Sequence, residues 1–482
     1  MESSAFTGIL LVVGVSFLII AIAYIHSRKG KTAEQFFVGN REYGTWIGAF
    51  TSAAAWTWAP ALFVSSQVAY TRGLPGVFWF TVPNALALIM FAFFANKVRG
   101  AMELGYTLPE YIKFRLGSRN QKLYSIVIFI VQCYAVVVQM LGSLLLLNLL
   151  TGLSKPFLIV VVATVFFVVA SFRGIRSSVS VDVFKVIMIL FVGVLVIPVV
   201  VSRAGGFSTI LGGIGGSSGG STNMFDAKIA WTYGIPTAIS LLSGITIDQQ
   251  QWQRAFAIRK KKVKGSFLLG GTLFFSVPVM LSMLGFITSN NSTGIMVNDP
   301  QLAGIGAIAK FFPAAGVAIF AIMVLAALIS AGSAALCAAS SITAVDIYKH
   351  YFGKNQNDKK LVGVARITML AMLILGVSVS LIPDISILYL QLLVGAFRAA
   401  LFIPTVLALF WKRLSGKVAF WSIISSMATG LPLFIYGSVI GNGNIATAGT
   451  LISLLLSGMI CAIGSLLTAK ALDAERVKGS RR

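Results

Sequence analysis

Thirteen long apolar segments dominate the sequence and restrict it to one class of fold. A helix needs about 20 apolar residues to cross the hydrocarbon of a bilayer. The segments do not alternate in polarity at every second residue, as the strands of a membrane barrel would. We therefore predict an all-α polytopic protein in a lipid bilayer, with about 13 transmembrane helices. The segments cover about residues 5–26, 45–71, 76–97, 121–150, 154–172, 179–201, 227–248, 266–288, 303–346, 361–382, 385–410, 417–438 and 447–469.

The charge distribution supports a membrane protein rather than a nucleic-acid-binding one. Only 11% of residues are charged and 57% are hydrophobic, although the net charge is +24. The basic residues gather in alternate short loops and in the C-terminal tail, as cytoplasmic loops do. This asymmetry predicts an N-terminus outside the cell and a C-terminus in the cytoplasm, with no nucleic-acid partner. The three cysteines lie in apolar segments, which indicates packing rather than disulfides or a metal site.

The stretch from Gly44 to Gly73 has the length of a membrane span but carries Pro60 near its middle. Proline has no N–H to give the carbonyl of Trp56, four residues earlier, and its ring displaces that carbonyl. A broken helix in a membrane is tolerated mainly where it lines a site. A kink whose carbonyl is satisfied by a neighbouring helix is the structural alternative.

Three further segments carry specific expectations. The segment 303–346 is too long for one crossing, so we predict an external helix over Ile305–Phe312 and a membrane helix that runs on to Tyr348. Residues 204–223 are rich in Gly and Ser and are expected to form a flexible external connector. Residues 97–122 mix basic and aromatic residues, which predicts an amphipathic helix at the cytoplasmic interface.

Few ionisable residues lie inside the apolar segments, and each marks a candidate functional site because a charge at the bilayer centre is costly. Asp182 and Lys185 are three residues apart on one predicted helix and are expected to pair with each other. A structural ion pair and a transport role both fit them. Arg366 lies near a cytoplasmic end, whereas Arg398 lies deep in its segment.

Four short stretches occur in a characteristic order: Phe36–Arg41 (FFVGNR), Asp248–Ala257 (DQQQWQRAFA), Ser330–Tyr348 and Pro404–Arg413 (PTVLALFWKR). Together they resemble signatures of the sodium/solute symporter family. The second is similar to the signature after the sixth core helix, and the third to the eighth core helix. The resemblance covers nearly the whole chain.

The resemblance implies a LeuT-like fold of two inverted repeats of five helices, at about 45–201 and 227–410. Residues 1–44 would form one extra helix and a cytoplasmic loop before the repeats. Residues 202–226 would form the external Gly/Ser-rich loop between them. Two further helices and the basic cytoplasmic tail would follow in residues 411–482.

The resemblance also implies that Na⁺ binds between the first and eighth core helices. Its carbonyl ligands would come from Ala54, Thr57 and Ala327, its hydroxyl ligand from Ser330, and Asp182 would lie on the ion's inner exit route. Position 331, where many members carry Ser or Thr, is alanine here. The Thr57 hydroxyl, Ser333 or water would then supply a ligand, and weak sodium coupling or proton coupling stays open.

Trp56 and Trp58 flank the predicted helix break and offer flat faces to a small planar or cationic solute, although core packing or lipid contact would also explain them. The gating aromatic of the family's sugar transporters corresponds to Gly244, which argues against a sugar. The short motifs are most similar to the urea and polyamine branch. We assign the substrate site to Trp56, Trp58, Gln67, Gln139, Ser243, Gln391 and Arg398.

These features predict a cation-coupled symporter in the cell membrane, with sodium as the expected ion, which imports a small polar solute such as urea or a related nitrogen compound by alternating access. A proton-coupled symporter, a proline or carboxylate symporter of the same family and a transporter-like sensor are the alternatives. The sequence offers no intramembrane His cluster, paired carboxylates or metal-ligand spacing that would support an enzyme.

Overall fold

The computed structural model describes residues 2–25, 32–217, 220–349, 357–383 and 385–467, without the side chains of residues 2–7, 11 and 173. These residues form helices and loops and no β-strand, apart from isolated bridges between Tyr43 and Ile258 and between Gly73 and Ser221. The loop 26–31 and the tail 468–482, on which part of the predicted orientation rests, lie outside the described residues.

The helical elements follow one another along the chain with short connections. They are α1 (Glu2–Ile25), α2 (Ala33–Val38), η1 (Gly39–Arg41), α3 (Thr45–Trp56), η2 (Pro60–Val64), α4 (Ser65–Arg72), α5 (Leu74–Ala101), α6 (Leu108–Leu116), α7 (Ser118–Thr151), α8 (Lys155–Arg173), α9 (Ile175–Phe191), η3 (Val192–Val196), α10 (Ile197–Arg203), α11 (Phe207–Gly213), α12 (Ala227–Ile229), η4 (Ala230–Gly234), α13 (Ile235–Thr246), α14 (Gln249–Ala257), η5 (Lys260–Lys262), α15 (Val263–Ser289), η6 (Asn291–Thr293), η7 (Pro300–Leu302), α16 (Ala303–Phe311), α17 (Ala315–Ser341), η8 (Ile342–Tyr348), α19 (Asp358–Ser380), α20 (Ile387–Phe410), α21 (Gly416–Val439) and α22 (Gly443–Leu467).

Eleven of the described helices are long and apolar enough to cross a membrane, or up to twelve when the bent pair α3 and η2–α4 counts as one span. The predicted number of 13 is therefore not confirmed. The segment predicted at 227–248 is helical from Ala227 to Thr246 but is not among these spans. Its Thr, Ser and Gly residues lower its apolar content, and several of them face the interior instead of lipid.

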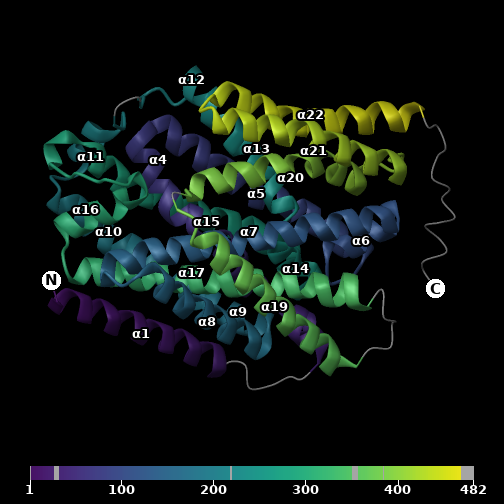
Figure 1. Cartoon of the computed structure of the whole chain (residues 1–482), viewed down its shortest axis with the longest axis horizontal. Helices are drawn as coiled ribbons and strands as arrows, with labels where there is room; N and C mark the ends of the chain where they lie inside the picture. The colour runs from purple at the N-terminus through teal and green to yellow at the C-terminus, as the bar shows by residue number, and fades with distance from the viewer. Residues whose placement is uncertain (1, 26–31, 218–219, 350–356, 384, 468–482) are drawn as a thin grey trace.

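The long helices run side by side across the molecule, and α7 and α17 lie in its middle (Figure 1). The helix α1 begins at one end of the bundle, and α22 ends at the other (Figure 1). Large apolar side chains stay exposed on the outer helices, among them Phe17 on α1, Ile374 on α19 and Val439 on α21. Such an apolar exterior is unusual in water and is what a lipid-facing surface requires.

The predicted break at Pro60 is confirmed. The helix α3 ends at Trp56, and the chain bends by 73° before η2 begins at Pro60. The N–H of Thr57 still donates to the carbonyls of Ala53 and Ala54, at 3.0 and 2.9 Å. The N–H of Ala59, within the break, donates to Gln139 Oε1 of α7 at 2.9 Å. A side chain of a neighbouring helix therefore satisfies backbone that the break leaves without a helical partner.

The predicted division of residues 303–346 is also confirmed, because α16 ends at Phe311 and α17 continues through η8 to Tyr348. The helix predicted within 97–122 is α6, which Thr107 and Glu110 cap reciprocally. The flexible connector predicted at 204–223 is wrong in its first half. There α11 packs on α15, and Ser289 Oγ donates to the carbonyl of Gly213 at 2.6 Å.

The short helix α14 is held inside the molecule by its glutamines. Gln249 Nε2 donates to Tyr106 O at 3.0 Å, Gln251 Nε2 to Ser52 O at 3.3 Å and Gln253 Nε2 to Phe37 O at 2.7 Å. Each acceptor belongs to a different segment, so one helix ties together the loop before α6, the helix α3 and the helix α2. This explains why the stretch QQQWQ is buried although it is polar.

Candidate functional site

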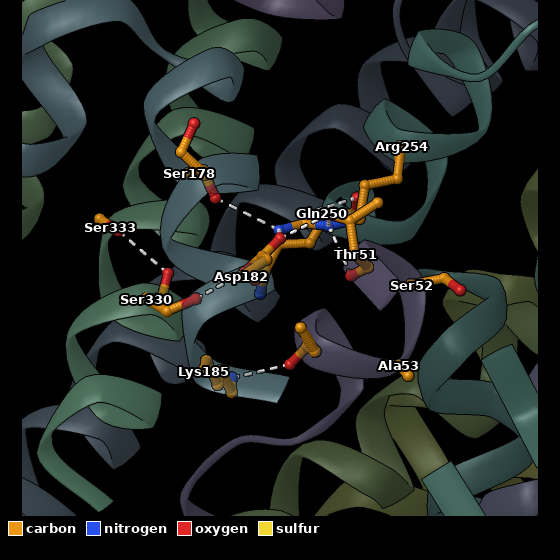
Figure 2. Close-up of polar contacts among 12 residues, drawn as sticks. Thr51, Ser52, Ala53, Ser178, Asp182, Lys185, Gln250, Arg254, Ser330 and Ser333 are labelled. Atoms are coloured by element: carbon orange, nitrogen blue, oxygen red, sulfur yellow. Dashed lines mark hydrogen bonds and ion pairs between the residues drawn. The ribbon is translucent and has the colours of Figure 1, made fainter. Parts of the chain in front are cut away.

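Asp182 on α9 is the centre of a buried polar cluster that joins four helices (Figure 2). Its Oδ2 accepts hydrogen bonds from Thr51 Oγ1 of α3 at 2.5 Å and from Arg254 Nη2 of α14 at 2.7 Å. Its Oδ1 accepts from Ser330 Oγ of α17 at 2.5 Å. The carboxylate is therefore satisfied by three donors, one of them a guanidinium, and a buried charge of this kind needs such partners.

Arg254 is buried as completely as the carboxylate that it pairs with. Its Nε donates to Thr51 O at 3.1 Å and to Thr51 Oγ1 at 2.9 Å, and its Nη2 also reaches Ser178 Oγ at 3.3 Å. The sequence alone did not indicate that Arg254 is buried. Its apolar neighbours Trp252 and Phe256 were the signal that α14 is buried.

Lys185 lies one turn after Asp182 on α9, but the expected pairing of the two side chains is wrong. Asp182 pairs with Arg254 (Figure 2). Lys185 Nζ instead donates to the carbonyl of Ala54 at 2.7 Å and to that of Ala327 at 3.3 Å. The first carbonyl belongs to the last turn of α3 before the break, and the second to α17. The ammonium group thus bridges the broken helix and α17.

Two of the predicted sodium ligands, the carbonyls of Ala54 and Ala327, accept hydrogen bonds from this lysine. The structure brings together Ala54, Ala327, Ser330 and Asp182, although the Lys185 ammonium contacts both carbonyls and the Ser330 hydroxyl is bonded to Asp182. The two candidates for the missing ligand bond within their own segments. Thr57 Oγ1 donates to Ala53 O at 2.9 Å, and Ser333 Oγ donates to Ser330 O at 3.0 Å. Sodium binding by these residues stays a prediction.

A second cluster lies beside the helix break and contains aromatic rings and one arginine. The rings of Trp56 and Trp58 lie 5.8 Å apart, and Tyr134 of α7 meets Trp58 edge-on at 5.7 Å. The guanidinium of Arg398, on α20, lies 5.7 Å from the centre of the Tyr134 ring. Its Nη2 donates to Ser240 Oγ of α13 at 3.3 Å. Four helices thus converge on the break.

This second cluster contains polar atoms that have no hydrogen-bond partner among the described residues. They are Trp56 Nε1, Tyr134 OH, Gln139 Nε2, Arg398 Nε and both Gln391 side-chain atoms. Each of these side chains is buried. An unsatisfied buried polar group costs about 1–3 kcal/mol. Buried polar groups without a partner need an explanation, and a bound polar solute would satisfy them.

Gly244 explains part of the shape of this cluster. A Cβ atom at position 244 would lie 3.0 Å from Arg398 Nη1, so the guanidinium occupies space that a larger residue would need. Gln391 and Arg398 lie two turns apart on one face of α20. Ser240 connects them, because its Oγ accepts from Arg398 and donates to Gln391 O at 3.0 Å.

The other two predicted substrate residues are Ser243 and Gln67. Ser243 is next to Gly244 on α13, and its Oγ donates to Ile239 O at 2.6 Å within the same helix. Gln67 lies on α4, beyond the break, and its Oε1 has no partner among the described residues.

A cavity of about 410 Å³ lies between the end of α7 and the start of α20. Leu141 and Ile387 line it, and they lie within about one turn of Gln139 and Gln391 respectively. A small solute has a volume well below that of a drug-sized ligand, for which pockets start at about 300 Å³. The cavity is therefore large enough to admit such a solute, but none of the residues of the second cluster lines it.

A helical membrane bundle with a broken helix, a buried polar cluster at the break and charges inside its spans is the architecture of a secondary transporter. The model of the sodium:solute symporter family matches residues 36–426. The chain belongs to this family and is a cation-coupled symporter, not an enzyme.

Relatives and solved structures agree with this assignment. The urea-proton symporter DUR3 of Oryza sativa subsp. japonica is 24% identical over 92% of this chain and 67% of its own length. The high-affinity proline transporter PutP of Bacillus subtilis is 24% identical over 88% of this chain and 92% of its own length. This chain spans 54–77% of the urea transporters that it resembles.

The fold is similar to that of a Na⁺-coupled sialic acid symporter solved in a substrate-bound outward-open state. The TM-score is 0.77 at 17% identity, and the match covers 96% of this chain and 98% of the other. This similarity confirms the LeuT-like fold of a multi-pass membrane protein. The predicted boundaries of the two inverted repeats stay a prediction.

Proposed function

We propose that this symporter imports a small, planar, polar solute, urea or a related nitrogen compound, through the cell membrane. The solute binds beside the helix break, among Trp56, Trp58, Tyr134, Gln139, Gln391 and Arg398. The observation that carries the proposal is the set of buried donors and acceptors there that have no partner among the described residues. The names of the urea transporters among the relatives support the choice of solute.

The chemistry of the unpaired atoms suits urea, which carries one strong acceptor and several N–H donors. Trp56 Nε1, Gln139 Nε2 and Arg398 Nε are donors for its carbonyl oxygen. Gln391 Oε1 and the Tyr134 hydroxyl are acceptors for its amide hydrogens. The faces of the two tryptophans favour a flat molecule.

A second candidate is a carboxylate solute such as proline. Arg398 favours it, because a guanidinium binds a carboxylate through two parallel charge-assisted hydrogen bonds. The proline transporter among the relatives is consistent with it. Uptake of radiolabelled urea into proteoliposomes, with unlabelled urea and proline as competitors, distinguishes the two solutes.

We also propose that the coupling cation acts between α3 and α17. The N-terminus of the protein is proposed to lie outside the cell and its C-terminus in the cytoplasm. The family description favours sodium. The name of one relative and the position of Lys185 favour the proton. Comparison of uptake under a sodium gradient with uptake under a pH gradient separates these cations.

The substitution Gln391→Leu tests the substrate site. It removes two polar atoms that have no partner among the described residues, at nearly constant volume. We expect the KM for urea to rise about tenfold, the equivalent of one lost hydrogen bond of about 1.4 kcal/mol. Thermal stability should stay the same or rise, because a buried unsatisfied amide is removed. A loss of stability with unchanged KM would instead assign Gln391 a structural role.

A further inference from the structure

Four buried polar residues form one line along α7, which we call the α7 line. Gln121, Ser125, Gln132 and Gln139 follow one another at intervals of four, seven and seven residues, so they lie within about 40° of one another around the helix axis. Each is at most 4% exposed. The line begins in the second cluster, at Gln139, and extends about 27 Å towards the start of α7. In the proposed orientation this is the cytoplasmic end.

Each glutamine of the α7 line uses one end of its amide and leaves the other end without a partner. Gln139 Oε1 accepts from the helix break at 2.9 Å. Gln132 Nε2 donates at 3.0 Å to Asp248 Oδ1, at the N-cap of α14. Gln121 Nε2 donates at 3.2 Å to Asp346 Oδ1, in the η8 segment that continues α17. The other amide atom of each glutamine has no hydrogen-bond partner among the described residues.

Ser125 differs from the hydroxyl residues in the second half of the same helix. Ser143 Oγ donates to Gln139 O at 2.8 Å and Thr151 Oγ1 to Leu147 O at 2.7 Å, one turn back along the helix. Ser125 Oγ is buried and has no partner among the described residues. The α7 line thus carries one buried, unpartnered polar atom on each of its residues, and such atoms need an explanation.

The unpartnered atoms of the α7 line change in character towards its inner end. In the second cluster, Gln139 Nε2 is a donor. Further along, Gln132 Oε1 and Gln121 Oε1 are acceptors. The elements that these glutamines contact add two more unpartnered acceptors, Gln250 Oε1 of α14 and Asp346 Oδ2 of η8. A solute that brings N–H groups would satisfy these oxygens, whereas a carboxylate would add further negative charge beside them.

We propose that the α7 line is the path by which the solute leaves the second cluster towards the cytoplasm, and that its unpartnered oxygens select an uncharged solute rich in N–H donors over a carboxylate. This inference rests on the proposed function and names the class of its solute. Urea has several N–H donors and no negative charge. Arg398 favours the carboxylate of proline in the second cluster, but the oxygens beyond it and Asp346 oppose the passage of that carboxylate.

The position of the 410 Å³ cavity agrees with this direction of release. The cavity is lined by α7 residues from Leu141 to Leu149, which follow Gln139 along the helix, whereas the rest of the α7 line precedes Gln139. The cavity and the α7 line therefore lie on opposite sides of Gln139 along the axis of α7. A solute that enters through the cavity and leaves along the line passes the level of the second cluster, as alternating access requires.

The first experiment tests the path by chemical modification and needs no transport. Ser125→Cys places a thiol on the α7 line, and Val127→Cys places one on the opposite face of the same helix, both in a Cys133→Ser background. Both positions are buried, so burial alone treats them alike. We expect a membrane-impermeant methanethiosulfonate to modify Ser125→Cys in inside-out vesicles and to leave Val127→Cys unmodified. Equal modification of the two, or none at Ser125→Cys, overturns the path.

The second experiment separates release from binding. Ser125→Leu fills the line with an apolar side chain, about 21 Å along the helix from Gln139. We expect it to abolish urea uptake into proteoliposomes. Ser125→Ala removes only an unpartnered hydroxyl, so the protein should keep its melting temperature. Its kcat should fall about tenfold with an unchanged KM, the equivalent of one hydrogen bond lost during release. A raised KM with unchanged kcat, or wild-type uptake by both variants, overturns the role of Ser125.

The third experiment tests the selection of the solute with radiolabelled urea and radiolabelled proline. We expect the wild type to accumulate urea and not proline. Accumulation of proline at the rate of urea overturns the selection by the unpartnered oxygens. An absence of uptake of both solutes under every gradient overturns the proposed function, while the modification of Ser125→Cys still decides whether the α7 line opens to the cytoplasm.

Discussion

Two serines on the same face of α17 have different partners, and this difference makes a matched test. Ser330 Oγ donates to Asp182 Oδ1 at 2.5 Å, whereas Ser333 Oγ donates to a carbonyl of its own helix. Ser330→Ala should lower the free energy of unfolding by about 1–3 kcal/mol, because a buried carboxylate oxygen loses its donor. Ser333→Ala should cost at most about 1 kcal/mol, since the carbonyl keeps its helical bond. Thermal unfolding in detergent measures both.

Equal losses in the two serine variants would contradict the assignment of Ser330 to the Asp182 cluster. If Ser330 served only as a sodium ligand, Ser330→Ala would affect cation dependence far more than folding. The contact with Asp182 changes that expectation, because the hydroxyl also satisfies a buried charge.

The pairing of Asp182 with Arg254 predicts strong energetic coupling. Asp182→Asn and Arg254→Gln should each destabilise the protein by about 3–5 kcal/mol, because each leaves a buried charge without its partner. The double variant should cost less than the sum, with a coupling energy of about 0.5–3 kcal/mol. A double-mutant cycle in thermal unfolding measures this. A stronger coupling between Asp182→Asn and Lys185→Gln would mean that Asp182 pairs with Lys185 instead.

At the residue scale, the sequence was a better guide to the important buried charges than to the partners of those charges. Asp182, Lys185 and Arg398 were singled out because charges inside apolar segments are rare and costly. Their partners depend on helices that are distant in sequence. Arg254 comes 72 residues after Asp182, and Ala327 comes 142 residues after Lys185. No local pattern contains that information, so pairing within one helix was the natural expectation.

At the scale of elements, glycines set how closely α15 approaches the broken helix. A Cβ at Gly285 would lie 2.2 Å from Ser66 O of α4, a backbone atom that a rotamer change does not move. Gly265, on the same helix, has Thr45 Cγ2 at 3.9 Å as its nearest neighbour. We expect Gly285→Ala to destabilise the protein by about 1–3 kcal/mol through overpacking.

Gly265→Ala is the matched control and should be neutral or stabilising by up to about 1 kcal/mol, because alanine favours helix more than glycine does. The measurement is the melting temperature of the two variants, together with urea uptake. A destabilisation of similar size in both variants would mean that the loss comes from the helix itself and not from its contact with α4.

The sequence predicted the elements well where hydrophobic length and proline decide them. The break before Pro60 and the division between α16 and α17 follow from such local rules. The segment 204–223 was expected to be flexible because glycine and serine carry little apolar surface. Its first half is instead held in place by residues outside the segment. For example, Asn290 Nδ2 donates a hydrogen bond to Thr209 O at 2.9 Å.

At the scale of the whole molecule, the orientation in the membrane can be tested across a single helix. Helix α15 has 27 residues and is therefore about 40 Å long, which exceeds the hydrocarbon thickness of about 30 Å. Lys261 lies just before it, in a basic segment, and Met296 follows it with 95% of its surface exposed. The proposed orientation puts Lys261 in the cytoplasm and Met296 outside the cell.

We expect a membrane-impermeant maleimide to label Met296→Cys on intact cells, and to label Lys261→Cys only after permeabilisation. The native cysteines interfere little, because Cys337 and Cys461 are buried, and Cys133, which is half-buried, can be replaced by serine. The reverse pattern would invert the proposed orientation. Labelling of both positions on intact cells would mean that α15 does not cross the membrane.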